Sequence, residues 1–172
     1  MTWNELFEDL FDRCVDLYQR GNTDMKTWYH VDDLTFLKLI GYKPREFFDF
    51  VEDYCEDKEP ARSTALLVAA ARRDYFLVVQ KGQPSDKIIG SDDVPSRRED
   101  LEGFNYLPRL IEKAKAKLRG ELDPDLMFCC GGDRAFLREH GNIHPADFLR
   151  QVWAADGDND KVLAFIESHL DE

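Results

Sequence analysis

Residues 33–51 read DLTFLKLIGYKPREFFDFV, and residues 133–152 read DRAFLREHGNIHPADFLRQV. Both stretches follow the frame Asp-x-x-Phe-Leu-basic-x-x-Gly and then Pro-x-acid-Phe, with one residue inserted near Asn142 in the second. Internal similarity of this kind indicates that one structural unit occurs twice in the chain. We therefore expect an all-α protein in which two related multi-helix units pack about a pseudo-twofold axis as one compact helical domain.

Apolar side chains recur at the spacing of a helix along most of the chain, which predicts seven or eight helices. Between residues 3 and 20 they lie three and four positions apart, and Gly21 stands where such a helix would end. Residues 63–80 are apolar almost throughout, which favours a buried helix, with a strand at 75–79 as the alternative. The other expected helices are a short one ending at Gly41, one beginning at Pro44, one beginning near Pro108, and three at about 133–140, 145–155 and 160–170.

Glycine, proline and charged residues are concentrated in residues 82–104. Such a composition is typical of a connecting segment, because it interrupts helices and offers little apolar surface to bury. We therefore expect a first helical unit at residues 1–81, a linker at 82–104 and a second helical unit at 105–172.

Composition and charge exclude several classes of function. The chain has a net charge of −12 and a pI near 4.8, which argues against binding to nucleic acid or to an anionic membrane, because such binding needs a cationic surface. No apolar run approaches the roughly 18 to 20 residues that span a bilayer, and the N-terminus lacks the pattern of a secretion signal. The four cysteines do not form a disulfide framework. A cytoplasmic protein is expected.

The charge is distributed unevenly along the chain. Residues 1–60 hold 15 acidic and 7 basic residues, residues 61–120 hold 8 and 12, and residues 121–172 hold 12 and 4. The middle third, with a net charge of +4, is therefore the only cationic part of the sequence.

Within that part, Arg109, Lys113 and Lys117 lie four residues apart and share one face of the expected helix 107–119. Like charges at this spacing repel one another, so an anionic group should face them. It can be an acidic residue of the same molecule. It can also be a phosphate, a carboxylate or an acidic partner, bound between this helix and the turn that precedes the next one.

On this basis we expect a binding or interaction protein that recognises a partner protein or a small anionic ligand through helix 107–119. The expected ligand-binding residues are Arg109, Lys113, Lys117, Cys130, Gly131, Gly132 and Asp133. The alternative is an enzyme whose site lies between the two units near Arg109, Cys130 and Asp133, with Cys130 as the nucleophile. The sequence contains no P-loop, no dinucleotide-binding glycine motif, no metalloprotease motif and no nucleophile elbow.

Two groups of residues resemble metal ligands, and neither forms a complete site. Cys129, Cys130, His140 and His144 have the donor atoms of a zinc site, but adjacent cysteines rarely chelate one ion, and a helix end is expected between the two histidines. Residues 156–167 match a calcium loop in their acidic positions but lack the glycine that the sharp turn requires. We expect neither a metal nor another cofactor.

Several short motifs resemble a known protein family. They are YLPR at 106–109, KAKAKLRG at 113–120, CGGDRAFL at 130–137 and HPADFL at 144–149. Through them the chain resembles a bacterial family catalogued only as a domain of unknown function. Cys129 departs from the glycine that the resemblance leads us to expect before Cys130. The resemblance implies no reaction, ligand or partner.

Overall fold

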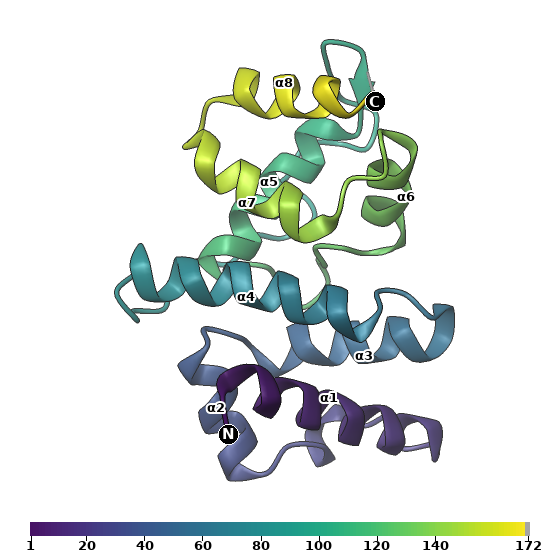
Figure 1. The fold of residues 1–172 in the computed structure, drawn as a ribbon, viewed down its shortest axis with the longest axis vertical. Helices are drawn as coiled ribbons and strands as arrows, with labels where there is room; N and C mark the ends of the chain where they lie inside the picture. The colour runs from purple at the N-terminus through teal and green to yellow at the C-terminus, as the bar shows by residue number, and fades with distance from the viewer. Residues whose placement is uncertain (171–172) are drawn as a thin grey trace. The chain divides into compact units, whose positions relative to one another are not determined.

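The computed structural model describes residues 1–170 and is mostly helical, as the sequence predicted (Figure 1). Among these residues there are eight α-helices and one sheet of two very short strands. The chain divides into two compact units, Met1–Pro84 and Ser85–Glu172. No helix in the described part of the chain combines the length and the apolar character needed to cross a membrane.

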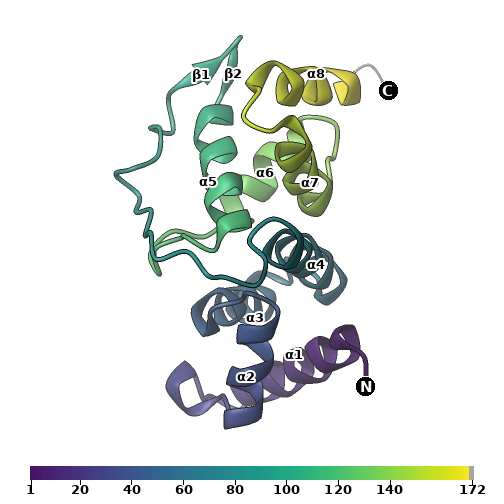
Figure 2. The same ribbon diagram turned by 90° about the vertical axis from the view of Figure 1, so that its left-hand side faces the viewer.

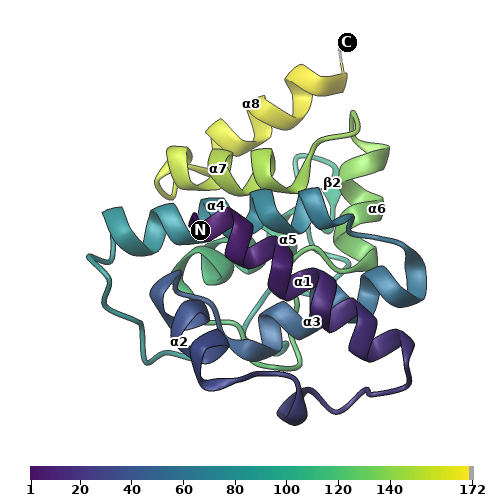
Figure 3. The ribbon, with the colours of Figure 1, turned by 60° about the horizontal axis from the view of Figure 1, so that its bottom comes forward.

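The first unit is built around a cluster of aromatic side chains. Helix α1 packs against α3 and α4, and the views in Figures 1 and 3 show α1 beside α3. Phe7 and Phe11 of α1 contact Phe47 of α3 with ring centroids 5.1 Å and 6.0 Å away, and all three rings are buried. The elements of this unit are α1 (Trp3–Gln19), the 3-10 helix η1 (Met25–Thr27), α2 (Val31–Leu39), α3 (Pro44–Asp57) and α4 (Arg62–Val78).

Helix α4 runs without a break through the charged stretch at Arg72 and Arg73, so the helix expected for this segment is correct and the alternative strand is not formed. Arg72 is buried, because its guanidinium lies over the ring of Phe76 at 5.1 Å and donates a hydrogen bond to the side chain of Gln80 at 2.7 Å. A cation with such partners is tolerated inside an otherwise apolar helix face.

The first helix of the second unit is preceded by a short hairpin that the sequence did not predict. Strands β1 (Asp100–Leu101) and β2 (Phe104–Asn105) pair antiparallel, directly before helix α5 (Leu107–Arg119), as Figure 2 shows. Helix α7 packs against α5 and also against α8. The remaining helices are α6 (Gly131–Glu139), α7 (Pro145–Ala155) and α8 (Asn159–Leu170).

The extended segment before the hairpin lies within the expected linker 82–104. It is held by contacts with α5 and with the chain that follows α5. Ile89 forms an isolated parallel bridge with Leu122, and the hydroxyl of Ser85 donates a hydrogen bond to Glu121 at 2.7 Å. From residue 85 onward this segment therefore belongs to the second unit.

Candidate functional site

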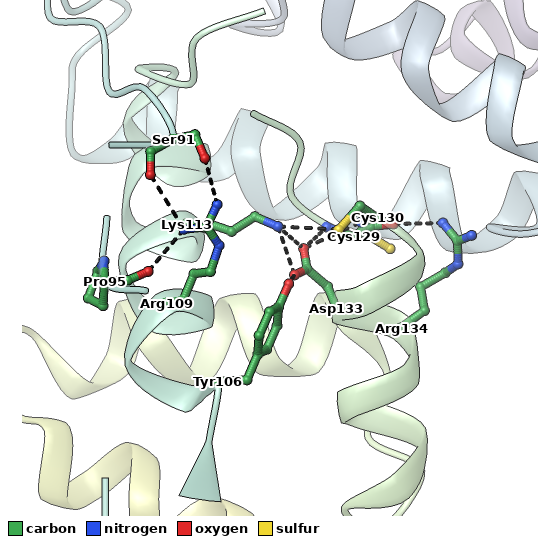
Figure 4. Close-up of polar contacts among 9 residues, drawn as sticks. All are labelled: Ser91, Pro95, Tyr106, Arg109, Lys113, Cys129, Cys130, Asp133 and Arg134. Carbon is green, nitrogen blue, oxygen red and sulfur yellow. Dashed lines mark hydrogen bonds and ion pairs between the residues drawn. The ribbon is translucent and has the colours of Figure 1, made fainter. Parts of the chain in front are cut away.

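A buried carboxylate lies at the centre of the second unit, where α5 meets the start of α6 (Figure 4). Asp133 is 0% exposed, and the ammonium group of Lys113, which is 2% exposed, lies 2.7 Å from each of its two carboxylate oxygens. An isolated charge would be very costly at such a position, whereas an ion pair with further hydrogen bonds can be accommodated.

The remaining hydrogen-bonding capacity of Asp133 is also used. The hydroxyl of Tyr106 donates to Oδ1 at 2.6 Å, and the backbone N–H groups of Cys129 and Cys130 donate to Oδ2 at 2.8 Å and 3.3 Å. One carboxylate thus connects the residue before α5, the body of α5 and the turn that begins α6. These parts of the chain hold one another in position.

The backbone at this site adopts conformations that are unfavourable in isolation. Tyr106 and Cys129 have φ angles of +77° and +71°, in the left-handed region that favours glycine. Each such residue costs about 1–3 kcal/mol and persists only where its surroundings enforce it. The conformation at Cys129 explains why a glycine would suit this position, as the family resemblance implied. Here, the bond from its N–H to Asp133 holds the cysteine in that conformation.

The two adjacent thiols differ in their surroundings. Burial, reinforced by the charge of Asp133, raises the pKa of Cys129 to about 12, so that this side chain stays protonated. Cys130 is half-buried, caps the start of α6, and has its sulfur 3.3 Å from the ammonium group of Lys113. Burial and the nearby Asp133 carboxylate also raise the pKa of Tyr106, which keeps its hydroxyl proton available for the bond to Asp133.

The basic side chains Arg109, Lys113 and Lys117 are all buried in the second unit. Arg109 donates hydrogen bonds to the carbonyl of Pro95 at 2.9 Å and to the hydroxyl of Ser91 at 2.9 Å, as drawn in Figure 4. Together with the pair between Lys113 and Asp133, these bonds show that the cations of α5 contact groups of their own molecule.

The structure thus brings Lys113, Cys130 and Asp133 together and places Gly131 and Gly132 in the exposed first turn of α6 next to them. Arg109 lies one turn earlier on α5, against the extended segment that contains Ser91.

A pocket of about 360 Å³ adjoins this network and was not predicted from the sequence. It lies between the β1–β2 hairpin and one face of α6. The only sequence signal for it is that residues 132, 135, 136 and 139 share a helix face, and nothing in the sequence identifies the hairpin that covers them. The pocket is lined by Gly103, Asn105, Tyr106, Gly132, Ala135, Phe136, Glu139 and His140.

Both histidines of the hypothetical zinc site have other roles. His140 stacks on Phe136 with ring centroids 4.1 Å apart, and its Nδ1 lies 2.7 Å from the carbonyl oxygen of the same residue. His144 accepts a hydrogen bond from the N–H of Ala146 at 3.1 Å and so caps α7. Within residues 1–170, histidine, cysteine and acidic side chains form no group of three or more that could hold a metal ion.

Part of the chain is similar to a known protein family. Residues 92–172 match the model of a domain of unknown function, DUF5069. The match covers the hairpin, helices α5 to α8 and the site described above, and it confirms the resemblance to an uncharacterised family. No curated protein and no solved structure matches the chain.

Proposed function

We propose that this chain is a binding protein and that its second unit takes a small molecule in the pocket between the β1–β2 hairpin and α6. The observation that carries the proposal is the buried network that fixes the pocket wall. Tyr106 lines the pocket, and its hydroxyl is held at 2.6 Å by Asp133, which is itself held by Lys113. A wall that is ordered before the ligand arrives reduces the entropic cost of binding.

The size and lining of the pocket agree with this role. Small-molecule sites have volumes of roughly 300–1,000 Å³ and combine apolar walls with a few polar groups. The volume of about 360 Å³ is near the lower limit, which favours a ligand of one or two rings. Phe136 supplies an aromatic wall, while Asn105 and Glu139 supply polar groups at its edge.

The pocket is better supported as a binding site than the basic face of α5. An anion that bound to Arg109 or Lys113 would have to compete with the hydrogen bonds these side chains make within the molecule. A pocket of about 370 Å³ in the first unit is also less suitable, because its charged residues Arg62 and Asp12 already form an ion pair with each other.

The binding proposal can be tested with a variant that fills the pocket. Ala135 lines it on α6, so Ala135→Phe should occupy the space, whereas Ala154→Phe adds the same ring on the exposed face of α7. Compounds found by a thermal-shift screen should raise the melting temperature of wild type and of Ala154→Phe, but not that of Ala135→Phe. Hits that stabilise Ala135→Phe as well as the wild type would refute the proposal.

A second candidate is thiol chemistry at Cys130, as in the enzyme considered from the sequence. It is favoured by the distance of 3.3 Å between its sulfur and the Lys113 ammonium, and by the position of Cys130 at the start of α6. Both features are found around reactive thiols in proteins, although Lys113 shares its charge with Asp133. The rate of alkylation of Cys130 distinguishes the candidates, because a catalytic thiol reacts rapidly well below about pH 8, whereas the thiol of a binding protein reacts slowly there.

We also propose that the protein acts in the bacterial cytoplasm and does not bind nucleic acid or membranes. A net charge of −12 opposes both kinds of polyanionic surface. All four cysteines are free thiols, which agrees with a reducing compartment. Cell fractionation with an antibody against the protein would test this location.

We further propose that the two units arose by duplication of one ancestral unit. Asp33 and Asp133 occupy the third position of α2 and α6, and each completes a capping box with the residue that caps its helix. Each also accepts a hydrogen bond from a basic residue twenty positions earlier, Arg13 in α1 and Lys113 in α5. These equivalent pairs extend the sequence similarity to helices where the sequences themselves have diverged.

The duplication can be tested in a crystal structure of the protein. Superposition of residues 33–52 on 133–153 should align α2 with α6 and α3 with α7, and should place Phe36 on Phe136 and Phe47 on Phe148. A different helix order or handedness in the two units would rule out duplication.

A further inference from the structure

The hydrogen-bonding groups of the pocket between the hairpin and α6 restrict the chemistry of its ligand. Nδ1 of His140 lies 2.7 Å from the carbonyl oxygen of Phe136. A carbonyl oxygen can only accept a hydrogen bond, so Nδ1 carries the proton. In the neutral imidazole the other nitrogen, Nε2, then has a lone pair and acts as an acceptor.

Tyr106 and Glu139 also act as acceptors towards a ligand. The hydroxyl proton of Tyr106 is donated to Asp133 at 2.6 Å, and the side chain of Cys130 also lies beside this hydroxyl, so towards a ligand its oxygen can only accept. The carboxylate of Glu139 makes no hydrogen bond or ion pair with any group in residues 1–170, and it lies at the exposed edge of the pocket. The donors of Tyr106 and His140 are already used, so among the lining side chains Asn105 is the one that can still donate to a ligand as well as accept from it.

The charge of the site also favours a ligand that donates hydrogen bonds or is cationic. The negative charge of Asp133 is compensated by Lys113, whereas that of Glu139 has no partner in the described part of the chain. The pocket wall is also aromatic, because Phe136 and His140 both line it and their rings stack at 4.1 Å. Such a wall favours a flat ring, and the negative face of an aromatic ring attracts a cation.

We infer that the ligand of this pocket is a small flat molecule with a cationic or strongly hydrogen-bond-donating nitrogen group, such as an amidine or a ring-bound amine. This inference rests on the proposed binding function and specifies its ligand class. The donor group would face the carboxylate of Glu139 and Nε2 of His140, and the ring would lie against the wall formed by Phe136 and His140. The ligand is therefore opposite in charge to the anion that the basic residues of α5 led us to expect.

A pair of probes with nearly the same shape and opposite charge tests the inference. Benzamidine has a flat ring with a cationic donor group, and benzoate has the same ring with an anionic acceptor group. Each is titrated into the ¹⁵N-labelled protein, and the backbone amide signals of Gly103 and Gly132 in the pocket wall are followed. Benzamidine should shift these signals at lower concentration than benzoate does.

Charge variants identify the group that is responsible. Glu139→Gln removes the proposed partner and nearly preserves the shape of the side chain. Glu167→Gln makes the same change at an exposed position of α8 outside the pocket. The affinity for benzamidine should fall about fivefold in Glu139→Gln, as expected for a partly exposed ion pair, and should be unchanged in Glu167→Gln.

Three results would overturn the inference. They are tighter binding of benzoate than of benzamidine, equal affinity of the two glutamine variants for benzamidine, and failure of both probes to shift the pocket signals. The proposed binding function would still stand if a compound of another chemical class bound to the wild type and not to Ala135→Phe. Only the inferred ligand class would then be wrong. A screen without any such compound would instead refute the binding function itself.

Discussion

Replacement of Lys113 by methionine should be among the most destabilising single changes in the second unit. Methionine has a similar length, so the main effect is the loss of the ammonium group that lies 2.7 Å from both oxygens of Asp133. Asp133 is 0% exposed and cannot be reached by solvent without local unfolding. Removal of one partner of a buried ion pair costs about 3–5 kcal/mol, because the other charge remains buried without compensation.

The ion pair between Arg13 and Asp33 in the first unit provides a control. The side chains of Arg13 and Asp33 are 34% and 19% exposed, against 3% and 0% for Lys113 and Asp133. Solvent therefore compensates Asp33 when its partner is removed, and Arg13→Met should cost only about 1 kcal/mol. The difference between the two substitutions, at least about 2 kcal/mol, measures the effect of burial on otherwise similar ion pairs.

The assay is equilibrium urea unfolding followed by resolved NMR signals from each unit, which gives a separate free energy of unfolding for each. The Lys113→Met/Asp133→Asn double variant should be more stable than the sum of the two single effects predicts, by about 2 kcal/mol, because neither charge is left alone. A loss of less than about 1 kcal/mol in Lys113→Met, or equal losses in Lys113→Met and Arg13→Met, would refute this account of the pair.

Three further predictions concern backbone, thiol and pH effects. Gly141→Ala should destabilise the protein by about 3 kcal/mol or more in urea unfolding, because the φ angle at this position is +90° and the new Cβ would lie 2.5 Å from a backbone oxygen. Gly21→Ala is the control: its φ angle is +91° but the space around it is open, so this change should cost only about 1 kcal/mol. Iodoacetamide should modify the half-buried Cys130 before the buried Cys129 in the native protein, as peptide mapping by mass spectrometry would show, and the reverse order would contradict the described burial. Folding raises the pKa of Tyr106, so the protonated hydroxyl contributes fully to the free energy of unfolding below its ordinary pKa of about 10. This contribution is lost as the pH rises above that value. Urea unfolding should therefore show that Tyr106→Phe loses less stability than the wild type between about pH 9 and pH 11.

Much of the helical structure could be predicted because its determinants are local. The expected helix at residues 3–20 is observed as Trp3–Gln19, and Pro44 begins α3 as expected. These features depend on apolar spacing, capping residues and the fixed φ of proline, which act within one or two turns. The hairpin before α5 was missed, because two paired residues in each strand are too few to produce an alternating pattern.

The site was harder to predict because its determinants are distant in sequence. Lys113 lies in a basic pattern that is also typical of a solvated helix face, and only the carboxylate of Asp133, twenty residues later, shows that this side chain points inward. The basic pattern predicts an acidic residue of the same molecule as one possible partner, but nothing in the sequence distinguishes Asp133 from the other acidic residues. The left-handed backbone at Tyr106, which turns its hydroxyl towards that carboxylate, has no signal in the sequence.

Burial of basic residues lowers the positive charge that the middle third of the chain presents at the protein surface. Residues 61–120 contain 12 basic and 8 acidic residues, but four of the basic ones, Arg72, Arg109, Lys113 and Lys117, are buried, and none of the acidic ones is. Eight basic and eight acidic residues therefore remain outside the interior in the only part of the chain that is cationic by composition. Long-range attraction accelerates encounters only when a surface has an excess of one sign. Encounter rates with anionic molecules should consequently gain nothing from lowering the ionic strength, because this part of the chain offers them no long-range attraction and the protein as a whole has a net charge of −12.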